Sequence, residues 1–176
     1  MKLYVTRHGE TPWNVENKIC GRTDVPLTTK GLAQAESLAQ RAGELDIDLI
    51  VASPMLRAMT TAQIVARHCG VPVIADERLV EQDYGIFEGR DRSDPGFLAN
   101  KRHFAFRYPG GESMMQMALR VYGLLEELHS RYADKTLLLV CHGGVCRIIN
   151  SYFRDLTNEE FFRYYIDNCA MECFHY

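Results

Sequence analysis

Short apolar runs alternate with segments of helical periodicity along the whole sequence, and this alternation limits the fold more than any other feature. Apolar runs of strand length occur at residues 3–5, 47–52, 71–75 and 136–141, and an alternating run occupies 169–176. The segments between them repeat apolar residues every three or four positions, as the core-facing side of a helix does. Strands that alternate with helices predict a layered α/β domain with a largely parallel sheet.

Capping residues and prolines predict where the helices begin. Thr28 or Thr29 is expected to cap a helix that places Leu32 and several alanines on its buried face. Pro54 is expected to open the next helix, and Ser113 has capping-box spacing for a long helix after it. Shorter helical segments are expected after residues 11, 94, 144 and 157.

Length and charge indicate one globular unit without a general affinity for polyanions. The 176 residues fit a single domain spanning 1–176, in which a basic and aromatic segment at about 90–109 forms a lid-like insertion. The net charge of -3 gives no overall attraction to nucleic acid or to an anionic membrane. No apolar run is long enough to span a bilayer, so we expect a soluble, cytoplasmic protein. The sequence gives no indication of its oligomeric state.

The six cysteines include no CxxC pair, and without an export signal we expect them to stay reduced. A metal site would have to use cysteines and histidines of the C-terminal half, whose spacings match no common zinc motif: Cys141, His142, Cys146, Cys169, Cys173 and His175. Buried or incidental thiols are the favoured interpretation.

Three of the predicted strands end in residues suited to phosphate chemistry. Arg7 and His8 follow the first strand, Arg57 lies one turn beyond the strand that ends near Ser53, and His142 follows the fourth. The carboxyl ends of parallel strands meet at one edge of a sheet, which is where ligands bind in such folds. Arg57 would start a helix, where the dipole disfavours a cation, so a bound anion would explain its position.

Together these residues can transfer a phosphoryl group without a metal or cofactor. One histidine attacks phosphorus, the arginines hold the nonbridging oxygens, and the second histidine donates to the same group. A carboxylic acid must protonate the leaving oxygen. The loop at 79–89 supplies Glu81, Asp83 and Glu88, which periodicity cannot rank. Attack by water on the phosphohistidine gives a phosphatase, whereas attack by a second hydroxyl gives a mutase.

The sequence from Arg7 to Thr11, Arg-His-Gly-Glu-Thr, resembles the signature of the histidine phosphatase superfamily, also called the phosphoglycerate mutase-like family. Further motifs follow in the family's order over nearly the whole chain: Gly21–Thr28 with Gly31, Ser53–Ala58 with Thr61 and Ala62, Glu81 with Tyr84–Gly85 and Glu88–Gly89, Gly110–Ser113, and His142–Gly144. Together these motifs are highly specific.

The resemblance implies a three-layer α/β/α sandwich and assigns roles to individual residues. It implies His8 as the phosphorylated nucleophile and Glu81, rather than Asp83 or Glu88, as the proton donor. The implied phosphate contacts are Arg7, Arg57 and His142, with Asn14 and Gly21 as further ones. Two cysteines depart from the family's usual residues, Cys20 before Gly21 and Cys141 before His142. If nearby arginines lower a thiol pKa, activity is expected to be sensitive to oxidants.

A phosphatase acting on small phosphomonoesters is the favoured function. Mutases of the family carry a longer insertion after the Glu81 segment, whereas only residues 90–109 separate Gly89 from Gly110 here. The subgroup is either a broad-specificity phosphatase or one resembling the compact α-ribazole phosphatases. The basic, aromatic segment suits an organic phosphate with a ring or extra negative charge. The alternatives are a phosphoglycerate mutase and a noncatalytic module that binds a phospho-ligand or a protein.

Overall fold

The computed structural model describes residues 1–176, and five strands form one sheet through its centre. They are β1 (Lys2–Arg7), β2 (Leu49–Ala52), β3 (Val73–Ala75), β4 (Thr136–Cys141) and β5 (Met171–His175). The strand order is β3-β2-β4-β1-β5, and only β5 runs antiparallel to its neighbour. The predicted α/β fold with a largely parallel sheet is therefore confirmed.

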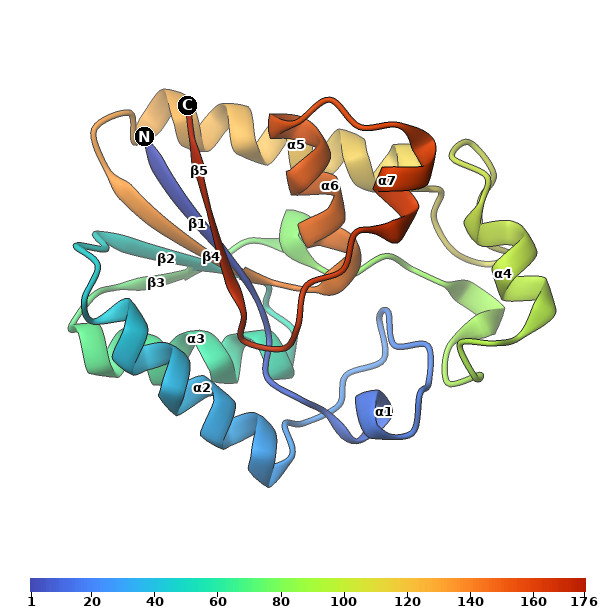
Figure 1. The fold of residues 1–176 in the computed structure, drawn as a ribbon, viewed down its shortest axis with the longest axis horizontal. Helices are drawn as coiled ribbons and strands as arrows, with labels where there is room; N and C mark the ends of the chain where they lie inside the picture. Colours follow the sequence, from blue (N-terminus) through green and yellow to red (C-terminus); the bar gives the residue numbers. More distant parts are fainter.

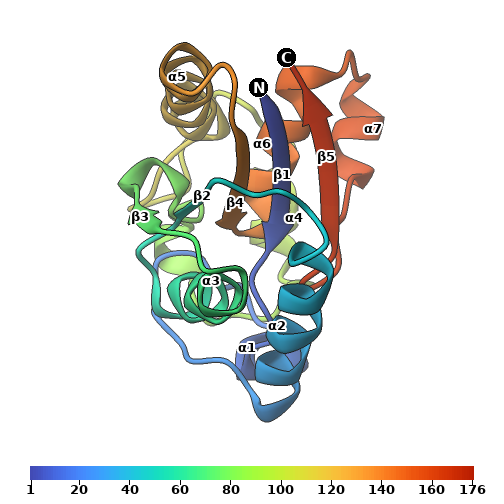
Figure 2. The same cartoon turned by 90° about the vertical axis from the view of Figure 1, so that its left-hand side faces the viewer.

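Helices cover both faces of this sheet, as Figures 1 and 2 show. Helices α2 (Thr29–Ala42) and α3 (Leu56–Cys69) pack on one face, and α5 (Met114–Arg131) and α6 (Gly143–Phe153) pack on the other. Three shorter helices lie in the chain's connections, and the last of them packs Phe161 into the core beneath α5 and α6: α1 (Pro12–Val15), α4 (Pro95–Lys101) and α7 (Asn158–Arg163). The two pairs of helices and the sheet between them form the three layers of an α/β/α sandwich.

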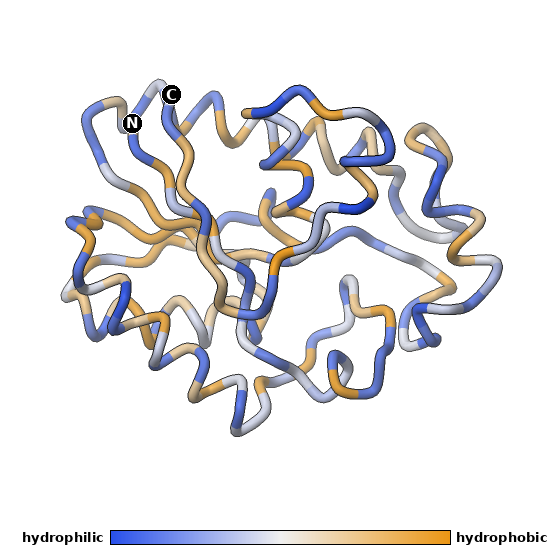
Figure 3. Tube along the Cα trace, in the orientation of Figure 1, coloured by the Kyte–Doolittle hydropathy of each residue, from blue (hydrophilic) through white to orange (hydrophobic).

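Strand β4 shows how the two layers share one sheet. Its side chains alternate, so that Leu137 and Leu139 enter the core under α5 and α6, while Leu138 and Val140 enter the core over α2 and α3. All four are completely buried. The hydropathy tube in Figure 3 accordingly shows apolar colour along the central strands. A strand buried on both faces carries apolar residues at every position, which is why this run is so apolar in sequence.

Two helices differ from the sequence prediction in detail. In α2 the predicted buried Leu32 is 42% exposed, and the buried face instead includes Gly31 and Leu38. The physical reason is close backbone contact, because a Cβ on Gly31 would lie 2.1 Å from the carbonyl oxygen of Glu10. Helix α3 begins at Leu56, two residues after the proline predicted to open it.

A third, smaller apolar cluster lies apart from the two main cores. It consists of Ile19, Phe87, Phe97 and Tyr108, with Tyr84 packed against it. These residues come from the loops beyond the carboxyl ends of the strands, where α1 and α4 lie in Figure 1. This end of the sheet is therefore bordered by an apolar cluster that is separate from the two main cores.

None of the helices described here combines the length and the apolar character that a membrane span requires.

Candidate active site

His8 follows directly on β1, and its ring is held in one tautomer. Its backbone N–H donates to the carbonyl of Cys141 at 3.0 Å, which continues the pairing of β1 with β4. The ring Nδ1 lies 2.7 Å from the carbonyl oxygen of Gly9, which can only accept, so Nδ1 carries the proton. Nε2 therefore carries the lone pair, which accepts from Nε of Arg57 at 3.3 Å. Burial, and then the charges of Arg57 and Arg7, lower the His8 pKa well below its usual value.

Arg57, the second residue of α3, is completely buried behind His8. Besides the bond to His8, its guanidinium donates to the carbonyls of Gly21 at 2.8 Å and Thr23 at 3.0 Å. These carbonyl oxygens compensate part of the positive charge of Arg57, a role that the sequence analysis assigned to a bound anion. A planar fork with several fixed partners holds its charge in one place.

Arg7, the last residue of β1, reaches the cavity from the other side. Its Nη1 donates to the hydroxyl of Tyr165 and to the carbonyl of Ile166, both at 3.1 Å. Tyr165 lies in the connection between α7 and β5 and is 65% exposed. The sequence patterns did not single out Tyr165, because it belongs to no recognisable motif.

His142 caps α6 and lies beside His8, with 5.2 Å between the ring centroids. Its Nε2 lies 2.8 Å from the hydroxyl of Ser53, at the end of β2, whereas its Nδ1 is buried without a partner. Burial, followed by the charge of Arg57, lowers the His142 pKa well below its usual value. A buried ring nitrogen without a partner is uncommon in a folded protein, so this Nδ1 is a candidate for contact with a bound group.

Glu81 lies at the start of α6, although it comes from the loop after β3. One carboxylate oxygen accepts from the N–H of Gly144 at 2.9 Å, and the other accepts from the N–H of Gln82 at 2.8 Å. Gly144 is needed for this approach, because a Cβ there would lie 2.4 Å from the carboxylate. The structure thus places Glu81 in the cavity, whereas neither Asp83 nor Glu88 lines it.

The two further predicted phosphate contacts differ in position. Asn14 lines the cavity, as His8 does, and its side-chain oxygen accepts a hydrogen bond from the backbone N–H of Thr11 at 3.0 Å. Gly21 does not line the cavity, since its N–H donates to Glu88 and its carbonyl accepts from Arg57. A Cβ on Gly21 would lie 2.2 Å from the carbonyl of Gln82, so the close approach it allows is to the neighbouring loop. Direct contact of Gly21 with phosphate stays a prediction.

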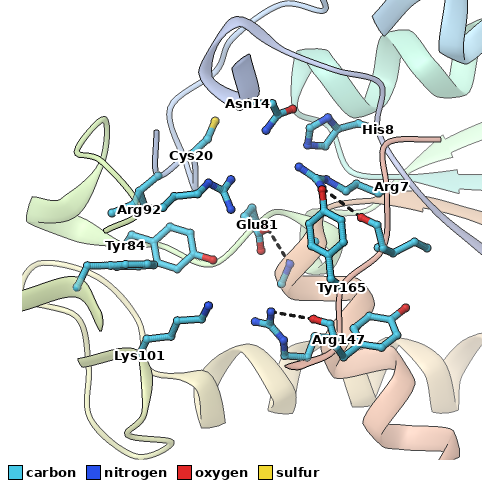
Figure 4. Close-up of a pocket in the computed structure, with 16 residues that line it drawn as sticks. Arg7, His8, Asn14, Cys20, Glu81, Tyr84, Arg92, Lys101, Arg147 and Tyr165 are labelled. Carbon is cyan, nitrogen blue, oxygen red and sulfur yellow. Dashed lines mark hydrogen bonds between the residues drawn. The ribbon is translucent and has the colours of Figure 1, made fainter. Parts of the chain in front are cut away.

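The cavity that these residues border measures about 100 Å³ and is shown in Figure 4. Arg7, His8, Asn14 and Glu81 line it, whereas Arg57 and His142 do not line it and lie against His8. The predicted lid segment contributes Arg92, Phe97 and Lys101, while its other basic residues do not line the cavity. Sequence reasoning missed Arg147 and Tyr165. Arg147 lies one helical turn after Gly143. This spacing places both residues on the same face of α6, and it is the sequence signal that could have indicated Arg147.

Cys20, which lines the cavity, and Cys141, at the end of β4, do not have the chemistry proposed for them from sequence. Burial raises the pKa of Cys20 despite the nearby Arg57, and it raises the pKa of Cys141 well above the usual value. The expectation of a thiol pKa lowered by arginines is therefore wrong for both. No three or more His, Cys, Asp or Glu side chains are grouped so that they could hold a metal ion.

Solved structures with the same architecture include two phosphatases. A mycobacterial glucosyl-3-phosphoglycerate phosphatase, solved in complex with VO3, has a TM-score of 0.88 and 28% identity, and the match covers 98% of this chain and 90% of that one. The α-ribazole phosphatase from Shigella flexneri has a TM-score of 0.86 and 26% identity over 98% of this chain and 89% of that one.

Sequence comparison gives a consistent result. The "Probable phosphoglycerate mutase GpmB" of Cronobacter sakazakii (strain ATCC BAA-894) is 37% identical over 179 residues, which cover 97% of this chain and 83% of that protein. The protein of the same name from Enterobacter sp. (strain 638) is 40% identical over 151 residues, covering 81% of this chain and 70% of that protein. The family model described as "Histidine phosphatase superfamily (branch 1)" matches residues 3–176. The strand-end histidines and arginines thus occur in a chain that belongs to the histidine phosphatase superfamily.

Proposed function

We propose that this protein is a metal-independent phosphatase that hydrolyses small phosphomonoesters through a phosphohistidine on His8. The observation that carries the proposal is the unprotonated Nε2 of His8, a cavity-lining residue whose tautomer is fixed by the bond from Nδ1 to Gly9. A neutral imidazole whose Nε2 carries a lone pair is a competent nucleophile toward phosphorus once a bound phosphoryl group takes over the hydrogen bond from Arg57.

The surrounding charges suit the transferred group. Arg57 and Arg7 lie beside His8, and their cations neutralise the nonbridging oxygens as charge redistributes in the transition state. The unpartnered Nδ1 of His142 provides a further site for a phosphoryl oxygen. The Ser53 hydroxyl accepts from the amide of Met55 at 3.4 Å and can donate its own proton to Nε2 of His142 at 2.8 Å. With Ser53 as the donor, a neutral His142 ring carries its proton on Nδ1.

The reaction balances in two steps. Nε2 of His8 forms a bond to phosphorus as the ester P–O bond breaks, and the carboxyl group of Glu81 gives its proton to the leaving alcohol. The resulting Glu81 carboxylate takes a proton from water, whose oxygen attacks phosphorus as the P–N bond breaks. Phosphate leaves, and the carboxyl group and His8 return to their first state.

A generic aryl phosphate assayed with a chelator tests the proposal. We expect turnover to persist with the chelator and to fall at least about a thousandfold in His8→Ala. Brief mixing with substrate should leave an acid-labile phosphoryl group on the wild type and none on His8→Ala. Turnover equal in the two proteins, or wild type inert on a panel of phosphomonoesters, would contradict the proposal.

A mutase is the second candidate, and the relatives named phosphoglycerate mutase favour it. The same phosphohistidine would then return its phosphoryl group to a second hydroxyl of the bound compound. Incubation with 3-phosphoglycerate separates the two outcomes. A phosphatase releases inorganic phosphate at the rate at which substrate disappears, whereas a mutase forms 2-phosphoglycerate with little phosphate release.

A further inference from the structure

Asn168 lies in the connection between α7 and β5, and its half-buried side chain reaches the nucleophile without lining the cavity. Its Nδ2 donates to the backbone carbonyl of His8 at 2.7 Å, and it lies 3.4 Å from Oδ1 of Asn14. A backbone carbonyl can only accept, so the contact with His8 fixes which end of the Asn168 amide faces it. The sequence patterns did not single out Asn168.

The same amide also decides the orientation of the Asn14 side chain. Oδ1 of Asn14 accepts from the N–H of Thr11 at 3.0 Å and from Nδ2 of Asn168 at 3.4 Å. Two donors at one end of an amide require its oxygen there. Because Asn14 lines the cavity, its N–H groups are the part of the amide that can face a phosphoryl oxygen.

The peptide group that joins His8 to Gly9 is held at both of its polar atoms. The His8 carbonyl accepts from Asn168, and the Gly9 N–H donates to Oγ1 of Thr61 at 3.1 Å. The next carbonyl, that of Gly9, is the one that holds Nδ1 of His8. Rotation of this peptide would move the Gly9 carbonyl away from Nδ1, so the bond from Asn168 helps to keep the nucleophile in its reactive tautomer.

The backbone at Asn168 is joined to the end of β1, past which the connection from α7 to β5 runs in Figure 1. Asn168 forms an isolated parallel bridge with Arg7, and the N–H of Cys169 donates to the carbonyl of Arg7 at 2.9 Å. Cys169 has a φ of 59°, a left-handed conformation that residues with a Cβ rarely adopt. Such a conformation persists only where the surrounding structure holds it, and it is frequent at functional sites. The turn at Cys169 therefore keeps Asn168 beside His8.

We propose that Asn168 is a positioning residue of the active site, which holds the peptide after His8 and turns the N–H groups of Asn14 toward the phosphoryl group. This inference rests on the proposed phosphatase function, because it takes Asn14 as a contact of the transferred group. Asn168 itself does not touch the substrate. Its effect on phosphate binding must therefore pass through Asn14, and its effect on turnover through Asn14 and His8.

A double-mutant cycle tests this assignment, because the effect of a positioning residue depends on the presence of its partner. Asn168→Ala and Asn168→Asp, neither of which can donate, are each made alone and together with Asn14→Ala. Thr6→Val is the control, since Oγ1 of Thr6 ties the same segment by donating to the carbonyl of Ala170 at 2.7 Å. For each protein, phosphorus NMR gives the dissociation constant of inorganic phosphate. Turnover of an aryl phosphate and the melting temperature are measured in parallel.

We expect Asn168→Ala to weaken phosphate binding about threefold to tenfold when Asn14 is present, and by less than about twofold in Asn14→Ala. Asn168→Asp should show the same dependence on Asn14 with a larger loss, because its charge also repels phosphate. Thr6→Val should lower the melting temperature but keep phosphate binding within about twofold of the wild type.

Unchanged phosphate binding in Asn168→Ala, or equal losses with and without the Asn14 side chain, would overturn the positioning role. A loss in Thr6→Val as large as that in Asn168→Ala would overturn it too, because any weakening of the segment would then suffice. If the cycle shows the expected dependence on Asn14 while the wild type hydrolyses no phosphomonoester, the proposed function fails and the role of Asn168 stands.

Discussion

Nε of Arg57 lies 3.3 Å from Nε2 of His8, and both side chains are buried. The atom proposed to attack phosphorus therefore points at the group proposed to hold the phosphoryl oxygens. A bound phosphoryl group would replace this bond, with an oxygen accepting from Arg57 and phosphorus facing Nε2. Two further bonds, to the carbonyls of Gly21 and Thr23, keep this guanidinium from moving away.

Arg57→Lys is expected to lower both activity and stability. An ammonium group cannot reproduce the fork that donates to His8, Gly21 and Thr23, so buried acceptors lose their partners. We expect kcat/KM for an aryl phosphate to fall at least about a hundredfold and the free energy of unfolding to fall by roughly 2–4 kcal/mol. Arg22→Lys, at an exposed position between Gly21 and Thr23, should change the free energy of unfolding by less than about 0.5 kcal/mol. Wild-type kcat/KM in Arg57→Lys would contradict this account.

Stability is expected to fall as the pH drops below about 6.5. The pKa values of His8 and His142 are lowered in the folded protein, whereas in the unfolded chain they titrate near the ordinary value of about 6.5. Between the folded and unfolded values the unfolded chain binds more protons. The free energy of unfolding then decreases toward acid, by up to about 1.4 kcal/mol per pH unit for each histidine.

Urea unfolding between pH 5 and pH 8 measures this dependence. His142→Gln removes one titrating ring while keeping a side-chain amide that can contact Ser53. We expect its slope below pH 6.5 to be smaller than that of the wild type, with little difference between the slopes above pH 7.5. Identical slopes over the acid range would show that His142 does not titrate as described.

Gly144→Ala should act through the neighbouring carboxyl group. Its Cβ would overlap the Glu81 carboxylate, so we expect kcat for an alkyl phosphate to fall about tenfold to a hundredfold. A nitrophenyl phosphate should be affected much less, because nitrophenolate leaves without a proton. In Gly143→Ala the nearest atom to the new Cβ is Nε of Arg7 at 3.9 Å, an ordinary contact. An equal loss on both esters in Gly144→Ala would argue against a role of Glu81 as proton donor.

Tyr165→Phe is expected to weaken substrate binding without unfolding the protein. The substitution removes one of the two acceptors that hold Nη1 of Arg7, and the carbonyl of Ile166 remains. We expect KM to rise about threefold to tenfold while the melting temperature stays within about 2 °C, because Tyr165 is largely exposed. Tyr164→Phe is the comparison, since its hydroxyl bonds Glu172 instead. A melting temperature that falls strongly only in Tyr165→Phe would point to a structural role.

The sequence predicted the sheet and the strand-end part of the cavity well, because both follow from short-range rules. Strands β1 and β4 are apolar runs of the right length, and the turns after them carry Arg7, His8 and His142. Parallel neighbours bring such turns together, which the structure shows as 5.2 Å between the two histidine rings. Selecting Glu81 needed the family resemblance, since its position depends on a contact with Gly144 far along the chain.

Features that depend on packing between distant segments could not be predicted. The spacing of Arg147 from Gly143 indicates its face of α6, but only the path of the chain around Tyr164 brings that face to the cavity. The exposure of Leu32 follows from how closely Gly31 approaches the backbone of Glu10, which periodicity does not encode. The raised thiol pKa of Cys20 likewise follows from burial, which outweighs the attraction of Arg57.

The segment that carries Phe97 and the strand end that carries His8 are expected to differ in the free energy of local unfolding, because they pack in separate apolar clusters. His8 is attached to the central strands, so its amide should exchange hydrogen only through large-scale opening of the sheet. Phe97, in contrast, belongs to the cluster with Ile19, Phe87 and Tyr108, which shares no member with either main core. We expect amides of residues 92–101 to exchange much faster, so that ligands enter by local unfolding of one wall while the nucleophile stays protected.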